Sequence, residues 1–375
     1  MKFKINRDHF SSGIQLVMSV VGSRKTMPIL QNVLIEAKDG LVWLTTTNLD
    51  LGAKCSVKAD ISEEGSITLP VKELGRIIRE LADMEVSIET GDTPKATIST
   101  RGSIFNVIGM ESKEFPPLPE LDEQIQFDFD REDLITMLKS VSYAQSVNEE
   151  RYMLKGVFFQ LSQGKLALVA TDGRRLAVTK SDIETKGEGE FILPSLSVNE
   201  IEKLPKVGNR IKVSFTDRQV SFELKVEEND DSGGFKNSIY LVSKVVEGKY
   251  PNYKQVIPKD DFNSAEVERE LMQECVHRAA LVSDEKVTLR IKTGVMEITG
   301  LSTLGDACES MSVNYEGEDA AVSFNPRFLL DPLKSIPQDK ITLDFRDDMS
   351  PGVFKVTTEK DEVIFLCVVM PIRTD

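Results

Sequence analysis

The sequence predicts an α+β protein made of three similar domains in tandem, each with two helices packed on antiparallel sheet. The first observation is a repeat, because residues i and i + 124 match at four landmarks without a gap. A fainter third copy follows, since "IKTGVMEITG" continues the pattern of "LSQGKLALVA" with an offset of 130. Each copy also closes on an X-Pro pair. The landmarks are residues 3–7 on 127–131, Gly40 on Gly164, Thr47-Asn48 on Thr171-Asp172 and Leu69-Pro70 on Leu193-Pro194, and the closing pairs are Phe115-Pro116, Tyr250-Pro251 and Met370-Pro371.

The three copies have the same predicted order of elements, and we place the domains at residues 1–124, 125–256 and 257–375. In the first copy the alternating strand "KFKIN" leads into an amphipathic helix. Three or four strands follow, among them "VLIEA", "LVWLTTT" and "GAKCSVKA", and Leu69-Pro70 opens a second helix. The strands "EVSIET", "KATIST" and "SIFNVIG" complete the unit. The apolar face of the first helix contains Phe10, Ile14, Val17, Met18 and Val21.

The helix after Pro70 separates basic from apolar side chains. Lys72, Arg76 and Arg79 fall within about 60° of each other at 100° per residue. A solvated helix face usually mixes both signs of charge. Three cations are few, so two interpretations remain, a solvated helix face and a basic binding surface. The opposite side of this helix is apolar and contains Leu74, Ile77, Ile78 and Leu81. The equivalent helices of the other copies add further cations, which favour a shared basic surface: Lys203, Lys206, Arg327 and Lys334.

The composition favours a cytoplasmic protein that performs no chemistry. There are 46 basic and 61 acidic residues, and the net charge of −15 argues against tight neutralisation of nucleic-acid phosphates, although a small basic surface remains possible. No signal peptide or membrane span is expected. The four cysteines lie far apart, which is typical of a reduced chain without zinc. Phosphate-loop, dinucleotide and metalloprotease motifs are absent, so no cofactor or metal is expected, and an enzyme acting through Asp172 would lack a base.

The stretch "ATDGRRLA", residues 170–177, interrupts two apolar runs with a turn. Gly173 alone supplies the permissive backbone that an Asp-Gly turn needs. The two arginines after it are not required for turning. A catalytic loop, a phosphate cradle, a docking surface and a solvated hairpin are all compatible with the residues alone.

Three motifs together resemble one family, the bacterial DNA sliding clamps, which are the β subunits of the replicative polymerase. They are "VATDGRRLAV" in the second copy, "VVEGKYPNYKQVIPK" between the second and third, and the ending "VVMPIR". The resemblance covers the whole chain. It implies that two chains close head to tail into a ring of six domains, with helices lining the hole around duplex DNA. It further implies a processivity factor that tethers polymerase and clamp-loader subunits through short peptide motifs.

The resemblance also implies a hydrophobic groove for partner peptides, in which the "ATDGRRLA" turn is one wall. Leu and Phe anchors of a peptide would bury against Val, Met and Pro side chains there. The family often has His where this chain has Arg174, and Thr374 and Asp375 extend past the usual end. The implied groove residues are Leu154, Thr171, Gly173, Arg174, Arg175, Leu176, Pro251, Val256, Val368, Val369, Met370, Pro371, Ile372 and Arg373.

Two further surfaces are implied in the same way. DNA contacts at the ring face match the family at Arg24 and Tyr152, whereas Asn148 and Met153 only occupy the corresponding positions. The dimer would be closed by the first and third copies, with Phe105 and Val107 meeting Leu281 and Val282. A second interpretation is a peptide-binding scaffold of the same fold that does not encircle DNA.

Overall fold

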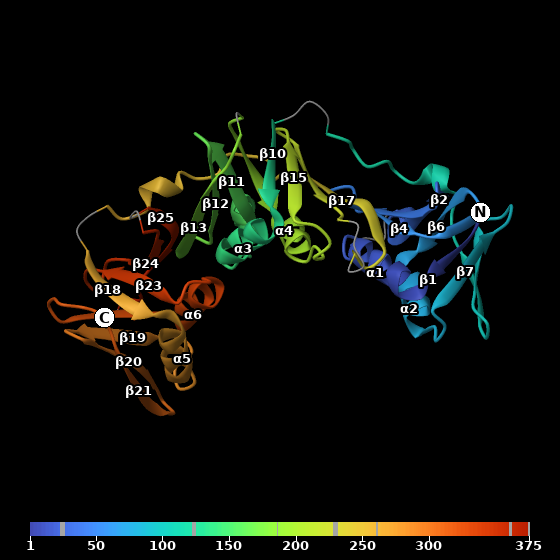
Figure 1. Ribbon diagram of the computed structural model, residues 1–375. Helices are drawn as coiled ribbons and strands as arrows, with labels where there is room; N and C mark the ends of the chain where they lie inside the picture. Colours follow the sequence, from blue (N-terminus) through green and yellow to red (C-terminus); the bar gives the residue numbers. More distant parts are fainter. Residues whose placement is uncertain are drawn as a thin grey trace. The chain divides into compact units, whose positions relative to one another are not determined.

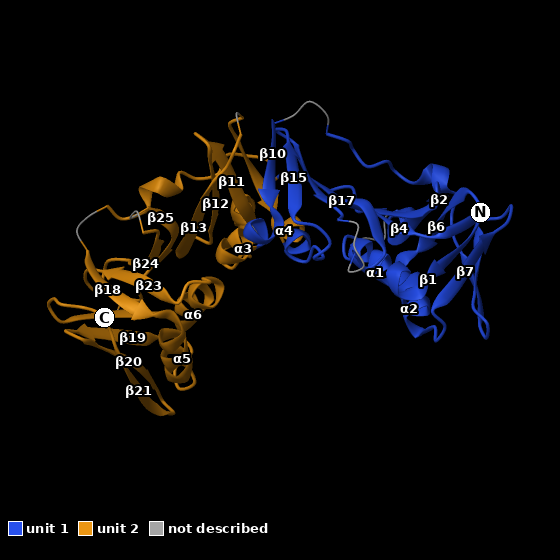
Figure 2. Ribbon diagram, in the orientation of Figure 1, with its two compact units in different colours: residues 1–135, 199–245 blue, residues 136–198, 246–375 orange. Residues whose placement is uncertain are grey.

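The computed structural model describes residues 1–22, 27–121, 125–185, 187–227, 232–259, 262–359 and 362–373. The chain forms two compact units, of which unit 1 contains residues 1–135 and 199–245 and unit 2 contains residues 136–198 and 246–375 (Figures 1 and 2). The division between them falls inside helices α3 (Arg131–Ser142) and α4 (Ser195–Glu202). None of the helices in the described ranges is long and apolar enough to cross a membrane.

In the described part of unit 1, two antiparallel sheets carry the helices α1 (Arg7–Met18) and α2 (Val71–Glu80). The five-stranded sheet has the order β5-β1-β7-β8-β9, and the eight-stranded sheet has the order β10-β15-β16-β17-β4-β3-β2-β6. The strands are β1 (Lys2–Asn6), β2 (Asn32–Lys38), β3 (Leu41–Thr47), β4 (Leu51–Lys58), β5 (Asp60–Glu63), β6 (Gly65–Pro70), β7 (Glu85–Thr90), β8 (Lys95–Ser99), β9 (Ile104–Ile108), β10 (Ile125–Asp130), β15 (Arg210–Phe215), β16 (Gln219–Lys225) and β17 (Phe235–Lys244).

Helix α1 begins where the sequence signals a helix start. The Asn6 side chain accepts hydrogen bonds from the Asp8 and His9 amides, which satisfies two free N–H groups of the first turn. The apolar face expected from the sequence is buried at Phe10, Ile14 and Val17. This face packs on α2 and on strands β3 and β4, so the helix closes one side of the core.

Unit 2 repeats the pattern in its described residues with the helices α5 (Arg269–Ala280) and α6 (Pro326–Ser335), which pack against each other. Its eight-stranded sheet has the order β14-β11-β12-β13-β25-β24-β23-β18, and its four-stranded sheet has the order β21-β20-β19-β22. The strands are β11 (Gly156–Ser162), β12 (Lys165–Thr171), β13 (Arg175–Asp182), β14 (Gly189–Pro194), β18 (Asn263–Glu268), β19 (Val287–Lys292), β20 (Val295–Ser302), β21 (Gly305–Ser312), β22 (Ala320–Phe324), β23 (Lys340–Phe345), β24 (Gly352–Thr357) and β25 (Val363–Val369).

The element order confirms the α+β fold and its threefold repeat. A strand, a helix, a group of strands, a second helix and three final strands recur three times along the chain. The first copy differs by the short strand β5, which the sequence patterns did not predict. The domain boundaries themselves stay a prediction, and the first of them adjoins residues 122–124, which lie outside the described residues.

Two strand pairings join neighbouring copies, and we call them joint 1 and joint 2. At joint 1, β17 of the second copy pairs antiparallel with β4 of the first, with Val242 opposite Gly52. At joint 2, β25 of the third copy pairs antiparallel with β13 of the second, with Val368 opposite Leu176. Each eight-stranded sheet therefore combines strands from two copies. This explains why the compact units cut across the repeats, because the hydrogen-bonded ladder continues through each joint.

Candidate functional site

The turn between β12 and β13 is held by its own polar side chains. The Thr171 hydroxyl donates to the Arg175 carbonyl at 2.6 Å and accepts from the Gly173 amide at 3.1 Å. One Asp172 carboxylate oxygen accepts from the amides of Arg174 at 2.9 Å and Arg175 at 3.0 Å. Gly173 has φ +86°, a left-handed conformation in which a side chain would be strained. The "TDG" residues therefore build a well-defined turn.

The two arginines that follow have different surroundings. Arg174 is exposed, whereas Arg175 is only 7 % exposed. The Arg175 guanidinium donates to Asp172 Oδ2 at 3.1 Å, to Asp331 Oδ2 at 2.5 Å and to the Tyr143 carbonyl at 2.7 Å. Of the pair that the sequence placed in the groove, Arg174 presents its charge to solvent and Arg175 has its charge balanced inside unit 2.

The environment of Arg175 contains polar groups that stay neutral. Its guanidinium carbon lies 4.7 Å from the ring centre of Phe328 and 5.2 Å from that of Tyr143. Burial raises the pKa of the Cys367 thiol to about 12 and raises the pKa of the Tyr143 phenol well above its ordinary value. Both groups are protonated at physiological pH, so the carboxylates of Asp172 and Asp331 are the charges that balance Arg175.

Joint 2 places this turn beside the C-terminal segment, as the sequence led us to expect. Leu176 lies opposite Val368 and Arg175 opposite Val369. The ladder continues past the strand end, because the Met370 amide donates to the Arg174 carbonyl at 3.0 Å. The Ile372 amide then donates to the Ser323 carbonyl at 2.8 Å, which holds the segment against the end of β22.

An apolar cluster lies under this meeting point, and we call its exposed rim the peptide surface, formed by Arg174, Pro251, Val256, Met370 and Arg373. In the cluster, Leu176 and Val368 are 2 % and 4 % exposed and pack with Leu154. On the rim, Val256 is 59 % and Met370 48 % exposed, and Pro251 is exposed as well. Exposed apolar side chains over a packed apolar floor are suited to the anchors of a peptide.

Strand alternation divides the predicted groove residues between two sides of the sheet. Paired residues share a side and successive residues alternate. Leu176 and Val368 face the cluster just described, whereas Val369, at 0 % exposure, belongs to the core of the third copy. Arg175 shares the side of Val369. The remaining predicted residues are Thr171, Pro371 and Ile372, which are half-buried, and Gly173 and Arg373, which are exposed.

Several residues of the cluster were missed by sequence reasoning. Phe158 stacks on Tyr250 with ring centres 4.7 Å apart, and Val353 lies opposite Val368 in the sheet. Tyr253 also packs here, and its hydroxyl donates to Gln160 at 3.1 Å. The two tyrosines stand three residues apart in "YPNYKQV", which is a readable signal, but the contribution of Val353 depends on the pairing of β24 with β25.

The candidate DNA surface on α2 has the polarity that the sequence predicted. Lys72, Arg76 and Arg79 are exposed, and no carboxylate of the described residues forms an ion pair with them. Of the equivalent cations in the other copies, Lys203 pairs with Glu200 at 3.1 Å and Lys206 with Glu132 at 3.4 Å. Helix α2 thus presents three cations without an ion-pair partner among the described residues. The opposite face is apolar, with Leu74, Ile78 and Leu81 buried and Ile77 half-buried.

The other candidate DNA contacts differ in the solvent exposure of their side chains. Arg24 lies outside the described residues. Tyr152 is 54 % exposed, whereas Met153 is half-buried against the apolar cluster. Asn148 is exposed and caps the 3₁₀ helix Glu149–Leu154 by accepting from the Glu150 amide at 2.9 Å. Tyr152 is thus presented to solvent, and the side chain of Asn148 already has a structural partner.

Two edge strands, β9 and β21, each have a free side, and the first of them exposes large apolar side chains. β9 is the last strand of its sheet, with Ile104 71 %, Phe105 39 % and Ile108 77 % exposed. β21 is likewise an edge strand and contains the exposed Cys308. Leu281, the C-cap of α5 in the same unit, is 72 % exposed. The unpaired N–H and C=O groups of such edges are a template for pairing with a strand of another chain. The other predicted interface residues, Val107 and Val282, are half-buried.

Joint 1 differs from joint 2 because a segment of the chain, around Leu118, covers the surface of joint 1. The side chain of Leu118 lies on Gly52, where a β-carbon would be 2.3 Å from Leu118 Cδ2. The Tyr240 hydroxyl donates to the Pro119 carbonyl at 2.9 Å. Only about 90 Å³ remains open there. Leu176 occupies the position of Gly52 in joint 2, so the leucine slot of joint 1 has no counterpart there.

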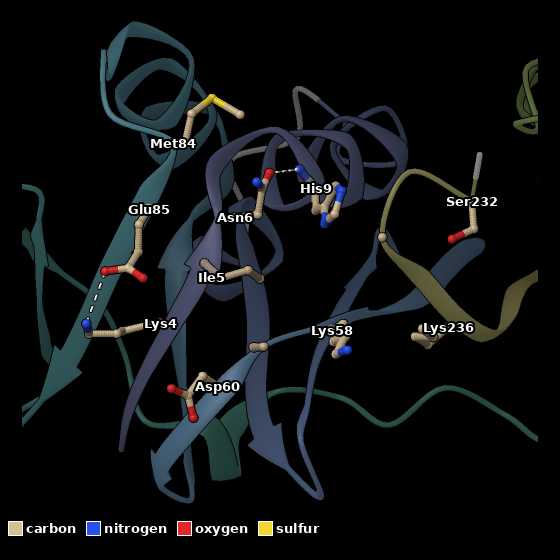
Figure 3. A pocket seen from close by; sticks show the side chains of 12 residues that line it. Lys4, Ile5, Asn6, His9, Lys58, Asp60, Met84, Glu85, Ser232 and Lys236 are labelled. Atoms are coloured by element: carbon tan, nitrogen blue, oxygen red, sulfur yellow. Dashed lines mark hydrogen bonds and ion pairs between the residues drawn. The ribbon is translucent and has the colours of Figure 1, made fainter. Parts of the chain in front are cut away.

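A larger pocket of about 730 Å³ opens in unit 1 between β1, the end of β4 and the segment before β17 (Figure 3). Its charged lining is mixed, and Lys4 pairs with Glu85 at 3.0 Å. Lys58, Lys236, His9 and Asp60 line the rest. No group of three or more potential metal-ligating side chains occurs in the described ranges.

Comparison with known proteins finds the same family in all three copies of the repeat. The DNA polymerase III beta subunit families match in order, the N-terminal domain at residues 1–119, the central domain at 128–252 and the C-terminal domain at 254–373. The beta sliding clamp of Chlamydia muridarum is 30% identical over 379 residues, covering 100% of this chain and 99% of that protein.

Solved structures agree. The Thermotoga maritima DNA polymerase III beta subunit has a TM-score of 0.86 at 29% identity, and the Bacillus subtilis sliding clamp has 0.90 at 26% identity. Both alignments cover 100% of either chain. The repeated element order, the two joints and these matches agree, and the chain belongs to the family of bacterial beta sliding clamps, the beta subunits of DNA polymerase III.

Proposed function

We propose that two copies of this chain close head to tail into a ring around duplex DNA and hold partner proteins through the peptide surface. One observation carries the proposal. Two of the three equivalent strand pairings are made within the chain, at joints 1 and 2, and the strands of the third pairing, β9 and β21, are left as free edges. A second copy can supply the missing pairing in both directions, which closes the assembly at two subunits.

The internal repeats predict the register of the missing pairing. Following the sheet pairings from the first strand of each copy shows that Phe105, Leu241 and Cys367 are equivalent. Leu241 lies opposite Ala53 and Cys367 opposite Ala177. The equivalent of these alanines in the third copy is Ala307, so Phe105 should lie opposite Ala307 of the partner subunit. The three series are Phe3-Ile88-Ile98-Phe105, Phe127-Val213-Phe222-Leu241 and Ala265-Leu343-Phe354-Cys367.

The same equivalence supports the predicted contact of Phe105 with Leu281. At joint 1, Leu241 and Ser19 line one pocket, and Ser19 is the C-cap of α1. Leu281 is the C-cap of α5 and so corresponds to Ser19. Phe105 corresponds to Leu241 and would therefore pack on Leu281 of the partner subunit. Val107 and Val282 complete this proposed interface.

Leu281→Asp should convert the dimer into monomers at micromolar concentration. Burying a carboxylate against Phe105 would cost several kcal/mol without a partner charge. Size-exclusion chromatography with light scattering measures the result. Lys286→Asp, in the loop before β19, is the control that should remain dimeric, and a dimeric Leu281→Asp protein would place the interface elsewhere.

The charge distribution fits a ring that holds DNA by topology. The chain has a net charge of −15, yet α2 presents three uncompensated cations. Contacts through such long, mobile side chains are weak and are screened by salt. The acidic remainder disfavours DNA on other surfaces. The DNA contacts we propose are Lys72, Arg76 and Arg79 on α2, with Arg24, Asn148, Tyr152 and Met153 at the ring face.

Clamps loaded on a nicked circle should survive high salt and be lost when the circle is linearised. Screening removes the phosphate contacts but does not open a closed ring. Gel filtration of labelled protein with DNA, before and after restriction cleavage, separates the two states. Replacing Lys72, Arg76 and Arg79 by alanine should slow loading and leave retention unchanged.

This experiment also distinguishes a ring around DNA from the second interpretation, a scaffold that binds peptides only. Equal loss from circular and linear DNA would contradict encirclement and favour a peptide-binding scaffold that does not surround DNA. In either case the partners bound at the peptide surface would be polymerase and clamp-loader subunits carrying short apolar motifs. The chain would perform no chemistry itself and would act in the cytoplasm.

A further inference from the structure

The buried guanidinium of Arg175 links the turn of the peptide surface to helix α6. Each of its three nitrogens donates to an acceptor in the chain, at Asp172, Asp331 and the Tyr143 carbonyl. Its faces lie against the rings of Phe328 and Tyr143. A guanidinium with this many partners has little rotational freedom, so its position is defined by the groups around it.

Asp172 connects this guanidinium to the backbone of the turn. One of its oxygens accepts from Arg175 Nε and the other accepts from the amides of Arg174 and Arg175. The Arg174 carbonyl in turn accepts from the Met370 amide at 3.0 Å. A shift of the Arg175 guanidinium would therefore move Asp172, the turn, and with them the rim residues Arg174 and Met370.

Asp331 is the carboxylate that helix α6 contributes to this arrangement. It lies on α6, and its Oδ2 is 2.5 Å from Arg175 Nη1. The exposed Arg327 approaches the same oxygen only to 3.8 Å, with its side chain 79% exposed. The contact with Arg175 is short and shielded, whereas the contact with Arg327 is long and solvated, so the first dominates.

We infer that Asp331 is a positioning residue for partner peptides, which holds the Asp172–Arg175 turn in its binding geometry through Arg175 without touching the peptide. The inference rests on the proposed function of the peptide surface. It assigns the buried arginine to pre-organisation and leaves Arg174 as the arginine that meets the ligand. The strand pairing of β13 with β25 does not depend on Asp331, so the fold should survive its loss.

The test compares Asp331→Ala with Arg327→Ala. Binding of a fluorescent Gln-Leu-x-Leu-Phe-type peptide is measured by anisotropy on the intact dimer. We expect Asp331→Ala to weaken binding at least tenfold while the dimer persists, and Arg327→Ala to stay within about twofold of the wild type. Asp331→Asn, which keeps the shape and one acceptor oxygen, should give an intermediate loss.

A double-mutant cycle separates positioning from general destabilisation. In an Arg175→Met background, which keeps the apolar stem and removes the guanidinium, Asp331→Ala should cause no further loss. Losses that multiply, or an Asp331→Ala protein that binds peptide within twofold of the wild type, would overturn the inference.

Hydrogen exchange distinguishes failure of this inference from failure of the proposed function. Without peptide, the amides of Gly173, Arg174 and Arg175 should exchange faster in Asp331→Ala than in the wild type. If the wild type binds no peptide, the function of the surface is wrong. If it binds peptide and the turn amides of Asp331→Ala remain protected, Asp331 does not position the turn.

Discussion

Deleting residues 370–375 should abolish binding of a Gln-Leu-x-Leu-Phe-type peptide while the protein remains a dimer. The deletion removes Met370, an exposed and adaptable apolar side chain, together with Ile372 and Arg373. Each buried apolar anchor contributes about 1.5–3 kcal/mol, so losing two of them lowers affinity by roughly 100-fold or more. Anisotropy or calorimetry measures the loss.

A shorter deletion is the control. Removing only Thr374 and Asp375, which lie outside the described residues, should leave peptide affinity nearly unchanged or slightly improved. The dimer should persist in both variants, because Met370 and Ile372 donate to the carbonyls of Arg174 and Ser323 in their own unit, whereas the proposed interface uses β9 and β21. Unchanged affinity after the longer deletion would refute the assignment of the peptide surface.

Ile104→Cys should form a disulfide with Cys308 of the partner subunit in nearly every dimer after mild oxidation. The register derived from the repeats places Ile104 opposite Cys308, one residue from the Phe105 and Ala307 pair. Opposed residues in antiparallel strands have α-carbons about 4.5–5.5 Å apart, within the range of about 4.4–6.8 Å that a disulfide requires. Non-reducing electrophoresis reads out the covalent dimer.

The chain offers a sharp control for this cross-link. Cys55, Cys275 and Cys367 are buried, and Cys308 is the exposed thiol. Phe105→Cys moves the new thiol by one residue to the opposite side of the sheet, so it should not cross-link efficiently. If Phe105→Cys cross-links and Ile104→Cys does not, the register is shifted by one residue. If neither reacts, β9 and β21 do not form the interface.

Much of the fold was predictable because its signals are local or periodic. The offset between copies, the alternation in "KFKIN" and the 100° spacing of Leu74 and Ile78 each depend on residues close together in the sequence. The structure confirms the strand, the buried face of α2 and the exposure of Lys72, Arg76 and Arg79. Local sequence restricts backbone conformation and side-chain periodicity, so these features need no tertiary information.

The candidate site was predicted in outline but not in the roles of its residues. The sequence brought the "TDGRR" turn and the C-terminal segment together only through resemblance to a family. It gave both arginines the same role, because neighbouring arginines look alike in a sequence. Their separation depends on strand alternation and on Asp331, which lies 156 residues from Arg175 along the chain.

The sequence by itself determined the repeats, the element types and the charged face of α2, because these follow from short-range covalent and steric constraints. Only the tertiary structure decided that β17 pairs with β4 and β25 with β13, that β9 and β21 each keep one free edge, and that Arg175 turns inward to Asp331. Such pairings are selected by the burial and hydrogen bonding of segments far apart in the chain, and a local pattern does not specify its distant partner.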